Sequence, residues 1–450
     1  MAYFKKVLIA NRGEIARRII RTCHRIGIKT VAVYSEADAE SLHVSEATEA
    51  VCIGPSQAKK SYLNMEKVIQ AAKETNADAI HPGYGFLSEN PEFVRRCEEE
   101  NIVFIGPSAE TIRLMGSKLE SRIQMQKAGV PVVPGTDQSI DSIEEAIKIA
   151  DDLGYPLMLK ASAGGGGIGM QLVQNEDELI KVFDTTRQTA SSYFNDGTVF
   201  LEKWISEPRH IEVQVIADAH GNVLHLYERE CSIQRRNQKV IEESPSPFLD
   251  EELRQRLLEA AVRGVKQIGY RNVGTMEFIF NEQKDFYFLE MNTRLQVEHP
   301  VTEEITGLDL VELQLKIAAK EAIPFKQEEI TKAGHAIECR LYAEDPVTFF
   351  PSPGVITTME LPEEARYDFG FQSGSKVTPF YDPMIGKIIV HGLNRDHAIE
   401  KMRKTLEGMN VQGIKTNQPL LVKIMKNDQF IGGDYTTQFL TQNQGTLLKN

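Results

Sequence analysis

Acidic and amide side chains lie on two neighbouring segments: residues 274–280 contain Glu277, and residues 286–300 carry such side chains at alternate positions. Both segments are rich in aromatic and β-branched residues and a polar stretch separates them, which predicts an antiparallel β-hairpin. Glu290 and Asn292 lie two apart and share one face of their strand, and Glu277 joins that face if the connecting loop has an even number of residues. Carboxylates that face each other across paired strands repel unless a cation lies between them. Oxygen ligands suit Mg²⁺ or Mn²⁺, so we predict a metal site here.

The polar run continues beyond Asn292 through Arg294, Gln296 and Glu298. Apolar residues occupy the intervening positions and would form most of the opposite face of the strand: Leu289, Met291, Leu295 and Val297. A solvated strand face that carries unrelated acids is the alternative interpretation. The unbroken polar run favours the floor of a binding site.

A glycine-rich stretch at 163–169 directly follows a predicted strand at 155–161 that contains Lys160. Consecutive glycines allow the backbone to approach a ligand closely and to turn several N–H groups toward phosphate oxygens. Stretches of this kind also form flexible connectors. Because this one joins two predicted strands that are close in sequence, we favour a flap that covers a phosphate, with Lys160 adding positive charge.

Several further positions could serve a nucleotide or an anion. Glu202 and Lys203 close the predicted strand 198–205, where the backbone could bind an adenine, although an exposed ion pair would look the same. His210 could be functional or could be a histidine at the edge of a core. Residues 231–239 combine three cations with three amides, which suits bicarbonate or phosphate, or else protects a strand edge.

The bulk composition restricts the class of protein. A chain of 450 residues is too long for one ordinary core and should contain roughly two to four domains. Its hydrophobic content of 41% and charged content of 26% are typical of a soluble protein, and its net charge of −13 argues against nucleic acid as the main partner. Five dispersed cysteines fit reduced thiols, and no stretch approaches the ~20 apolar residues of a membrane helix. We therefore expect a cytoplasmic protein that binds neither nucleic acid nor membrane.

Three regions follow one another along the chain. Residues 6–113 alternate short apolar runs with amphipathic stretches, which predicts parallel strands with crossover helices. The first turn lacks the glycine fingerprint of dinucleotide-binding folds. The turn at 81–85 ends a predicted strand, where ligands of open α/β sheets bind, although any tight turn has this composition. A second region reaches about residue 324, and a polar linker at 324–334 leads into a last α+β region.

Taken together, these motifs resemble the biotin carboxylase component of biotin-dependent carboxylases, a branch of the ATP-grasp ligases. The similarity covers nearly the whole chain and is carried by KKVLIANRGEIA, HPGYGFLSEN, MGSK, KASAGGGGIGM, PRHIEVQV, ERECSIQRRNQKV, EMNTRLQVEHPVTE, GHAIECRLYAEDP, PSPG and PFYDPMIGK. It implies an α/β and α+β fold of three domains. These are a Rossmann-like N-terminal domain at 1–113, an ATP-grasp domain at 114–330 with a glycine-rich lid at about 132–203, and an α+β C-terminal domain at 331–446.

The resemblance implies a ligase that cleaves ATP to ADP. ATP would be bound by Lys118, Lys160, Gly165, Gly166, Gly167, Glu202, Lys203, Ile205, His210, Gln234, Asn237, Glu277 and Glu290. Magnesium or manganese would bridge the phosphates to Glu277, Glu290 and Asn292. Phosphoryl transfer depends mainly on positioning by metal and cations, and a reactive intermediate needs a lid that closes.

The same resemblance implies roles around bicarbonate and biotin. Bicarbonate would lie near Lys239, Arg294, Gln296 and the backbone of Val297, and Glu298 would remove its proton. Attack on the γ-phosphate gives carboxyphosphate, which releases CO₂ beside a phosphate ion that deprotonates N1 of biotin. Arg340 would stabilise the biotin enolate, and Tyr84 would contact biotin with it. The catalytic set would thus be Arg294, Glu298, Lys239 and Arg340.

Partners follow from the same resemblance. Because no Ala-Met-Lys-Met biotinyl motif occurs, biotin would arrive on a separate biotin carboxyl carrier protein, with a separate carboxyltransferase subunit. The relatives imply a homodimer that serves an acyl-CoA carboxylase of the acetyl-CoA carboxylase type, in fatty acid biosynthesis. The LYAEDP motif at 341–346 favours relatives that serve other acyl-CoA carboxylases, and the carboxyltransferase selects the final acceptor.

Two positions depart from the family pattern. Ile168 stands in the flap where relatives often carry Arg or Lys, and Asn237 replaces a histidine that is common beside the nucleotide. We therefore expect weaker ATP binding without loss of the chemistry. Two other functions stay open at this point: an ATP-grasp ligase that transfers an activated carboxyl to an amine or another acceptor, and a catalytically weak paralogue that only binds nucleotide.

Overall fold

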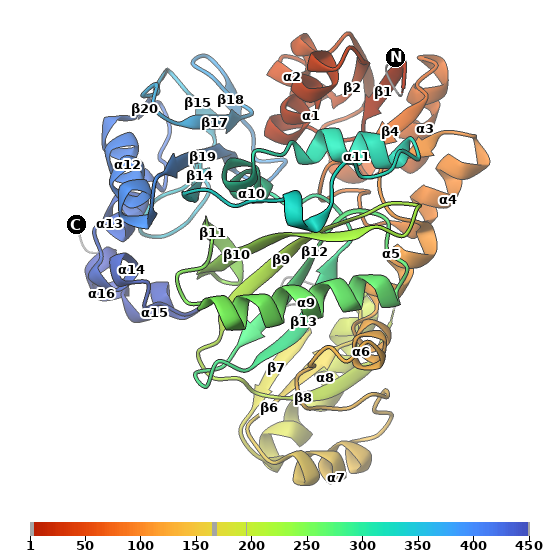
Figure 1. Ribbon diagram of the computed structural model, residues 1–450, viewed down its shortest axis with the longest axis vertical. Coiled ribbons are helices and arrows are strands. Elements are labelled where there is room, and N and C mark those ends of the chain that lie inside the picture. The colour runs from red at the N-terminus through yellow and green to blue at the C-terminus, as the bar shows by residue number, and fades with distance from the viewer. Residues whose placement is uncertain (1–3, 164–168, 195, 449–450) are drawn as a thin grey trace.

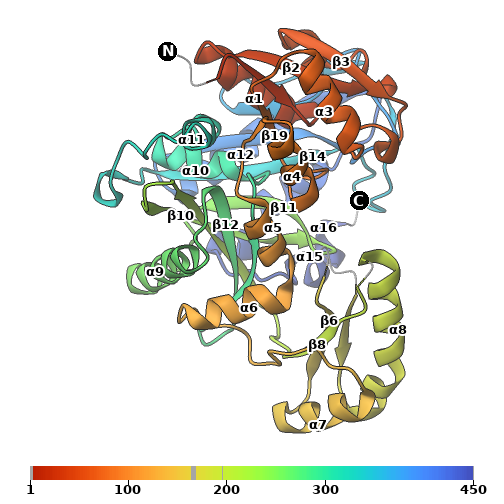
Figure 2. The same ribbon diagram turned by 90° about the vertical axis from the view of Figure 1, so that its right-hand side faces the viewer.

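The computed structural model describes residues 4–163, 169–194 and 196–448 (Figure 1). An N-terminal α/β unit and a C-terminal α+β unit lie next to each other along one side of a central sheet, and a smaller unit extends from the other side (Figures 1 and 2). No helix within those ranges is both long and apolar enough to cross a lipid bilayer.

The N-terminal unit is built on a five-stranded parallel sheet. Its strands are β1 (Lys6–Ile9), β2 (Lys29–Ser35), β3 (Glu49–Gly54), β4 (Ala79–His81) and β5 (Val103–Phe104). They lie in the order β3-β2-β1-β4-β5, so the chain must cross over between neighbours. The connecting helices are α1 (Gly13–Arg25), α2 (Leu42–Glu46), α3 (Met65–Glu74) and α4 (Pro91–Glu99), with 3₁₀ turns η1 (Glu36–Asp38) and η2 (Ala58–Lys60), and α5 (Ala109–Gly116) follows the last strand. The predicted parallel sheet with crossover helices is confirmed.

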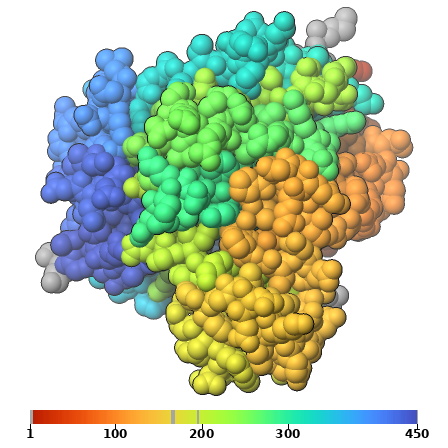
Figure 3. Space-filling view, turned by 60° about the horizontal axis from the view of Figure 1, so that its bottom comes forward, coloured from red at the N-terminus to blue at the C-terminus, as the bar shows by residue number. Residues whose placement is uncertain are grey.

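The smaller unit carries the predicted glycine flap. Helix α6 (Lys118–Lys127) leads into it, and it consists of α7 (Ile143–Leu153), β6 (Leu157–Ala161), β7 (Met170–Val173), α8 (Glu176–Phe194) and β8 (Val199–Lys203). The antiparallel sheet β7-β6-β8 and its two helices enclose a separate hydrophobic core, and the unit projects at the bottom of Figure 3. Residues Gly165, Gly166, Gly167 and Ile168 lie outside the described residues. We call this unit the lid.

The central sheet has eight antiparallel strands. They are β9 (Arg209–Ala217), β10 (Val223–Arg235), β11 (Gln238–Ser244), β12 (Asn272–Phe280), β13 (Phe286–Asn292), β14 (His335–Tyr342), β17 (Arg366–Phe369) and β19 (Met384–Gly392). Their order is β13-β12-β9-β10-β11-β14-β19-β17, and helix α9 (Glu251–Gln267) packs its apolar side against β9 and β12. The pairing of β11 with β14 carries the sheet into the C-terminal unit, so residues of both regions can reach one site.

The C-terminal unit covers the far end of this sheet with helices. Its remaining strands are β15 (Gly354–Val355), β16 (Thr358–Glu360), β18 (Lys376–Val377) and β20 (Asn410–Gln412). Its helices are α12 (Arg395–Gly408), α13 (Gln418–Met425), α14 (Asp428–Gly432), α15 (Phe439–Gln442) and α16 (Gln444–Leu447). Between the hairpin and β14 lie α10 (His299–Thr306), α11 (Leu310–Ala318) and the 3₁₀ turn η3 (Gln327–Glu329).

The predicted hairpin of β12 and β13 is confirmed, and its register places Glu277 directly opposite Glu290. The predicted strand alternation beyond Asn292 is wrong, because residues 293–298 form an irregular loop that leads into α10. A register shift after Glu277 makes Leu289 the extra residue of a β-bulge, which turns it away from the face that alternation predicts.

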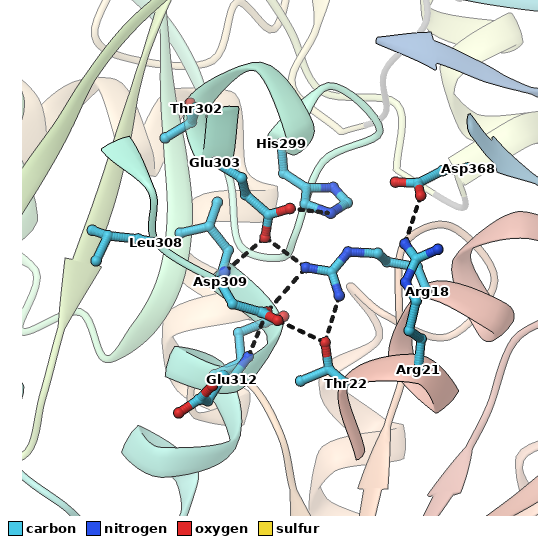
Figure 4. A network of polar contacts seen from close by, with 12 residues as sticks. Arg18, Arg21, Thr22, His299, Thr302, Glu303, Leu308, Asp309, Glu312 and Asp368 are labelled. Atoms are coloured by element: carbon cyan, nitrogen blue, oxygen red, sulfur yellow. Dashed lines mark hydrogen bonds and ion pairs between the residues drawn. The ribbon is translucent and has the colours of Figure 1, made fainter. Parts of the chain in front are cut away.

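A buried ion-pair network fixes the N-terminal unit to the central body (Figure 4). Arg18 on α1 donates from Nη2 to Glu303 Oε1 at 2.6 Å on α10 and to Asp309 Oδ1 at 3.0 Å ahead of α11. Thr22 Oγ1 donates to Asp309 Oδ2 at 2.8 Å. The Arg18 side chain is only 4% exposed, so its charge depends on these partners rather than on water.

We expect Arg18→Met to lower the free energy of unfolding by about 3 kcal/mol, because it removes a buried cation that bonds Glu303 and Asp309 and leaves Glu303 with Arg366 alone. Thermal and denaturant unfolding measure the change. The control is Arg113→Met, which removes an exposed pair with Glu110 and should change stability little. Equal losses for both variants would contradict the stabilising role of the network.

Candidate active site

A cavity of about 480 Å³ opens where the lid strands, the strands β9 to β13 and the loop 293–298 meet. Most of the predicted site residues line it: Lys118, Lys160, Glu202, Lys203, Ile205, His210, Gln234, Asn237, Lys239, Glu277, Glu290, Asn292, Arg294, Gln296, Val297, Glu298 and Arg340. Leu289 lines it too, as a consequence of the bulge. Tyr84 is not among the lining residues, and its hydroxyl donates a hydrogen bond to Glu14.

Lys239 on β11 is the charged centre of the cavity. Its Nζ donates to three carboxylates: Glu212 Oε2 at 2.6 Å, Glu277 Oε1 at 2.8 Å and Glu298 Oε1 at 2.6 Å. Burial alone would lower the pKa of Lys239, but these three carboxylates raise it well above its ordinary value. Burial opposes ionisation of Glu298, yet Lys239 and Arg340 hold the pKa of that carboxyl far below its usual range. Lys239 and Glu298 are therefore both charged.

A second cation, Arg229 on β10, is fully buried and shares the Glu212 carboxylate with Lys239. It bonds Glu212 through Nε, and its other nitrogens donate to Gln214 Oε1 at 2.6 Å and Gln296 Oε1 at 2.7 Å. None of the sequence motifs singled out Arg229, Glu212 or Gln214. The sequence does carry a signal for Glu212 and Gln214, because polar side chains alternate along HIEVQVIAD, residues 210–218. Polar residues at every second position of a central strand need buried hydrogen-bond partners.

The hairpin carboxylates suit a hard divalent cation. Burial and the adjacent Glu277 raise the pKa of Glu290, which forms a long ion pair with Lys118 at 3.8 Å. Glu290 is thus a carboxylate with a deficit of positive charge. Glu277 has positive charge nearby, because Lys239 and His210 outweigh the effect of burial and lower the pKa of its carboxyl group. Asn292 donates from Nδ2 to Glu277, while its oxygen accepts from Arg294, so metal ligation by Asn292 requires exchange of that bond.

At the lid end of the cavity the cations are paired with carboxylates or carbonyls. Lys160 forms an ion pair with Glu202, and Arg122 approaches the same carboxylate at 3.4 Å. Lys203 donates to the carbonyl of Gly154 at 2.6 Å, so its charged end points toward the end of α7. Lys203 and Ile205 both line the cavity.

His210 and Gln234 form a hydrogen-bonded pair on the floor of the cavity. Gln234 Nε2 lies 2.9 Å from His210 Nδ1, and His210 Nε2 lies 2.9 Å from Glu277 Oε2. The amide donates to Nδ1, so Nε2 carries the proton that faces the carboxylate. Asn237 lies in the β10–β11 turn with φ of 63°, a backbone region that asparagine tolerates.

Arg294 and Arg340 approach from different regions of the chain. Arg294 Nε donates to Glu89 Oε2 of the N-terminal unit at 2.8 Å, and Arg340 Nη2 donates to Glu298 Oε2 at 3.0 Å. The Val297 carbonyl accepts from Lys387 Nζ at 2.8 Å. The cavity therefore offers two guanidinium groups, one ammonium group and an ionised carboxylate within one wall, which can hold a small oxyanion and take a proton from it.

We expect Lys239→Met to remove the cation that Glu277 and Glu298 share, so that the pKa of each carboxyl, which Lys239 lowers, rises toward its unfolded value. A carboxyl with a lowered folded-state pKa stabilises the folded protein above its unfolded pKa, so the loss of stability should be small near about pH 3 and should grow to a plateau above about pH 6. The thermal midpoint as a function of pH measures it. Lys404→Met, at an exposed lysine, is the control and should show a small, pH-independent change. A constant difference for Lys239→Met would contradict the shared-cation arrangement.

Comparison with known proteins shows the family. Three family models match consecutive segments: the biotin carboxylase N-terminal domain at residues 3–112, the carbamoyl-phosphate synthase L chain ATP-binding domain at 117–326, and the biotin carboxylase C-terminal domain at 338–442. Biotin carboxylase 2 of Bacillus subtilis is 59% identical over 441 residues, which cover 98% of this chain and 99% of that protein.

Solved structures agree. A biotin carboxylase complex from Campylobacter jejuni superposes with a TM-score of 0.95 at 48% identity, covering 98% of this chain and 99% of that one. The biotin carboxylase domain dimer of Hydrogenobacter thermophilus 2-oxoglutarate carboxylase, in complex with MgADP, ADP and bicarbonate, gives a TM-score of 0.95 at 48% identity over 99% of both chains. With nearly its whole length matched in both sequence and fold, this chain belongs to the biotin carboxylases, the ligases that use ATP to carboxylate biotin.

Proposed function

We propose that this chain carboxylates biotin carried by a separate carrier protein, using ATP and bicarbonate, with the wall of the cavity around Lys239 as its reaction centre. The observation that carries the proposal is the bonding of Lys239 to Glu298, with Arg340 on the other oxygen of the same carboxylate. An ionised base held between two cations is what deprotonation of a bound oxyanion requires.

Glu298 is the base in this proposal. Bicarbonate that enters beside Arg294 and Lys239 competes with Glu298 for their positive charge, and the loss of that charge raises the pKa of the carboxyl toward a value useful for a base. Gln296 and the backbone of Val297 complete the bicarbonate site. The proton then passes from bicarbonate to a Glu298 oxygen, and the carbonate oxygen attacks the γ-phosphorus of ATP to form carboxyphosphate and ADP.

The nucleotide lies between the lid and the central sheet. Lys118, Lys160 and the glycines 165–167 would contact its phosphates, while the Glu202–Ile205 segment, His210, Gln234 and Asn237 would contact its nucleoside. Glu277, Glu290 and Asn292 would hold a magnesium or manganese ion, which when bound neutralises charge on the phosphate oxygens. The raised pKa of Glu290 in the free protein supports this assignment, because a cation there relieves the repulsion by Glu277.

Transfer to biotin completes the reaction. Carboxyphosphate breaks its carbon–oxygen bond to give CO₂ and a phosphate ion, and that phosphate takes the N1 proton of biotin. The enolate so formed attacks CO₂, with Arg340 balancing its negative charge. Tyr84 would contact biotin from the N-terminal unit.

The wider assembly is inferred in the same way. A biotin carboxyl carrier protein brings the biotin, and a carboxyltransferase subunit transfers the carboxyl group from carboxylated biotin to an acyl-CoA of the acetyl-CoA type. The chain forms a homodimer. A biotin carboxylase domain dimer of a relative supports this proposal. We also infer domain limits near residues 113 and 330, with the lid at about 132–203. The family-model matches at 3–112, 117–326 and 338–442 fit between these limits.

The direct test supplies free biotin, ATP, magnesium and labelled bicarbonate and measures labelled carboxybiotin and ADP. We expect both products, with ADP formation dependent on bicarbonate and stimulated by biotin. ADP formed with amine acceptors but not with biotin would favour an amine-directed ATP-grasp ligase instead. Nucleotide binding with no product would favour a paralogue without catalysis.

We expect Glu298→Gln to lower kcat for carboxybiotin formation by about 10² to 10⁴, because the amide cannot accept the bicarbonate proton. The Kd for ATP should change little, since the phosphates lie nearer the hairpin. Glu259→Gln, at an exposed glutamate on α9, is the matched control and should keep the wild-type rate. A Glu298→Gln enzyme with nearly full activity would remove Glu298 as the base.

Asn237→His should tighten nucleotide binding with little change in the chemical step, because the imidazole adds a stacking and hydrogen-bonding surface at the cavity rim. Histidine tolerates the left-handed backbone conformation found at this position. Calorimetric titration with ADP and ATP measures the Kd. An unchanged Kd would remove Asn237 as the cause of weak nucleotide binding.

A further inference from the structure

Two buried carboxyl groups face each other behind Arg340. Glu242 on β11 and Glu338 on β14 are direct cross-strand partners, so their side chains lie on the same face of the central sheet. Both have 0% exposure. Neither residue belongs to the cavity lining, and the reaction proposed above makes no use of them.

The two carboxyl groups differ in their hydrogen bonds. Glu242 Oε1 accepts from Arg340 Nε at 2.6 Å, and Arg340 Nη2 lies 2.5 Å from the same oxygen. Within the described ranges of the chain, Glu242 Oε2 and both oxygens of Glu338 have no hydrogen-bond partner. Glu338 is therefore a fully buried carboxyl group with no hydrogen bond to stabilise a negative charge, and only the more distant charges of Lys387 and Arg340 favour its ionisation.

Among the described residues, no cation forms an ion pair with Glu338. Arg340 is shared between Glu242 and Glu298, and Lys239 is bonded to three other carboxylates. Lys387 on β19 donates to the Val297 carbonyl at 2.8 Å and lies 3.3 Å from Glu14 Oε2.

The remaining titratable neighbours do not add positive charge. Tyr84, Tyr342 and the thiols of Cys231 and Cys339 interact electrostatically with the pair and are neutral at pH 7, because burial raises the pKa of each. Glu298 adds a further negative charge. Two adjacent carboxylates in such a place cannot both ionise at modest cost.

We propose that Glu242 and Glu338 hold one proton between them at neutral pH, that Glu338 carries it, and that this neutral acid is a positioning residue which keeps the charge of Arg340 available to the cavity. Burial, first of all, raises the pKa of Glu338 well above its ordinary value and that of Glu242 to about 7.

The functional consequence rests on the role proposed for Arg340. If Glu338 also ionised, a second negative charge behind Arg340 would draw the guanidinium toward the pair and away from Glu298 and the biotin enolate. An extra unit charge several ångströms away, at a protein-like dielectric constant, changes the affinity for an anionic group by about tenfold. The biotin KM of the enzyme should therefore rise as the pair loses its proton.

Infrared difference spectroscopy tests the proton directly. The wild-type protein at neutral pH should show a carbonyl stretch of a protonated carboxyl that shifts in D₂O and is absent from Glu338→Gln. Glu243→Gln is the matched control, because Glu243 is buried on the opposite face of the same strand pair and Arg395 and His335 lower its pKa to about 2. That variant should keep the band. No band difference between wild type and Glu338→Gln would overturn the proposal.

Kinetics with free biotin test the consequence. Above neutral pH the KM of the wild type should rise by about tenfold relative to that of Glu338→Gln, which copies the protonated acid and cannot ionise. Glu338→Met, an apolar residue of similar length, gives a second variant that should fold and show the same flat profile. Parallel KM profiles in wild type and both variants would overturn the positioning role. Absence of biotin carboxylation in the wild type would instead overturn the proposed function and leave the infrared result standing.

Discussion

The bonding of one lysine to three carboxylates is the constraint on which the site depends. Lys239 lies on β11 and reaches past β10 to Glu212 on β9 and Glu277 on β12, while Glu298 joins from the loop before α10. Such a cluster is stable only if the four adjacent strands keep their register and if Arg229 supplies a second charge below. The strand order β12-β9-β10-β11 is thus needed to bring these charged side chains together as well as to build the apolar core.

The distribution of charge divides the cavity into regions with different chemistry. Around Lys239, Arg294 and Arg340, carboxylates are ionised and a small oxyanion finds positive charge. At Glu290, by contrast, a raised pKa marks a place where positive charge is lacking. In the proposed function, a divalent cation that arrives with the nucleotide would correct this deficit, so that binding of metal and binding of ATP would reinforce each other. Behind Arg340, the Glu242 and Glu338 pair limits the negative charge by holding a proton.

Much of the fold and site followed from the sequence because the motifs are local. The hairpin of Glu277 and Glu290, the parallel N-terminal sheet and the lid strands depend on alternation and turn composition within short segments. Arg229, Glu212 and Glu338 were missed because their importance comes from partners on strands that are distant in sequence. The extension of the strand beyond Asn292 was wrong because polar alternation in a loop resembles that in a strand. The domain limits and the roles of individual site residues stay predictions.

Diffraction from crystals grown with Mn²⁺ and a non-hydrolysable ATP analogue tests the central claim most directly, because anomalous scattering locates the metal independently of the protein atoms. We predict a manganese peak between the carboxylates of Glu277 and Glu290, with Lys239 still bonded to Glu212 and Glu298. A peak elsewhere in the cavity, with Glu277 and Glu290 unligated, would contradict that arrangement of charges.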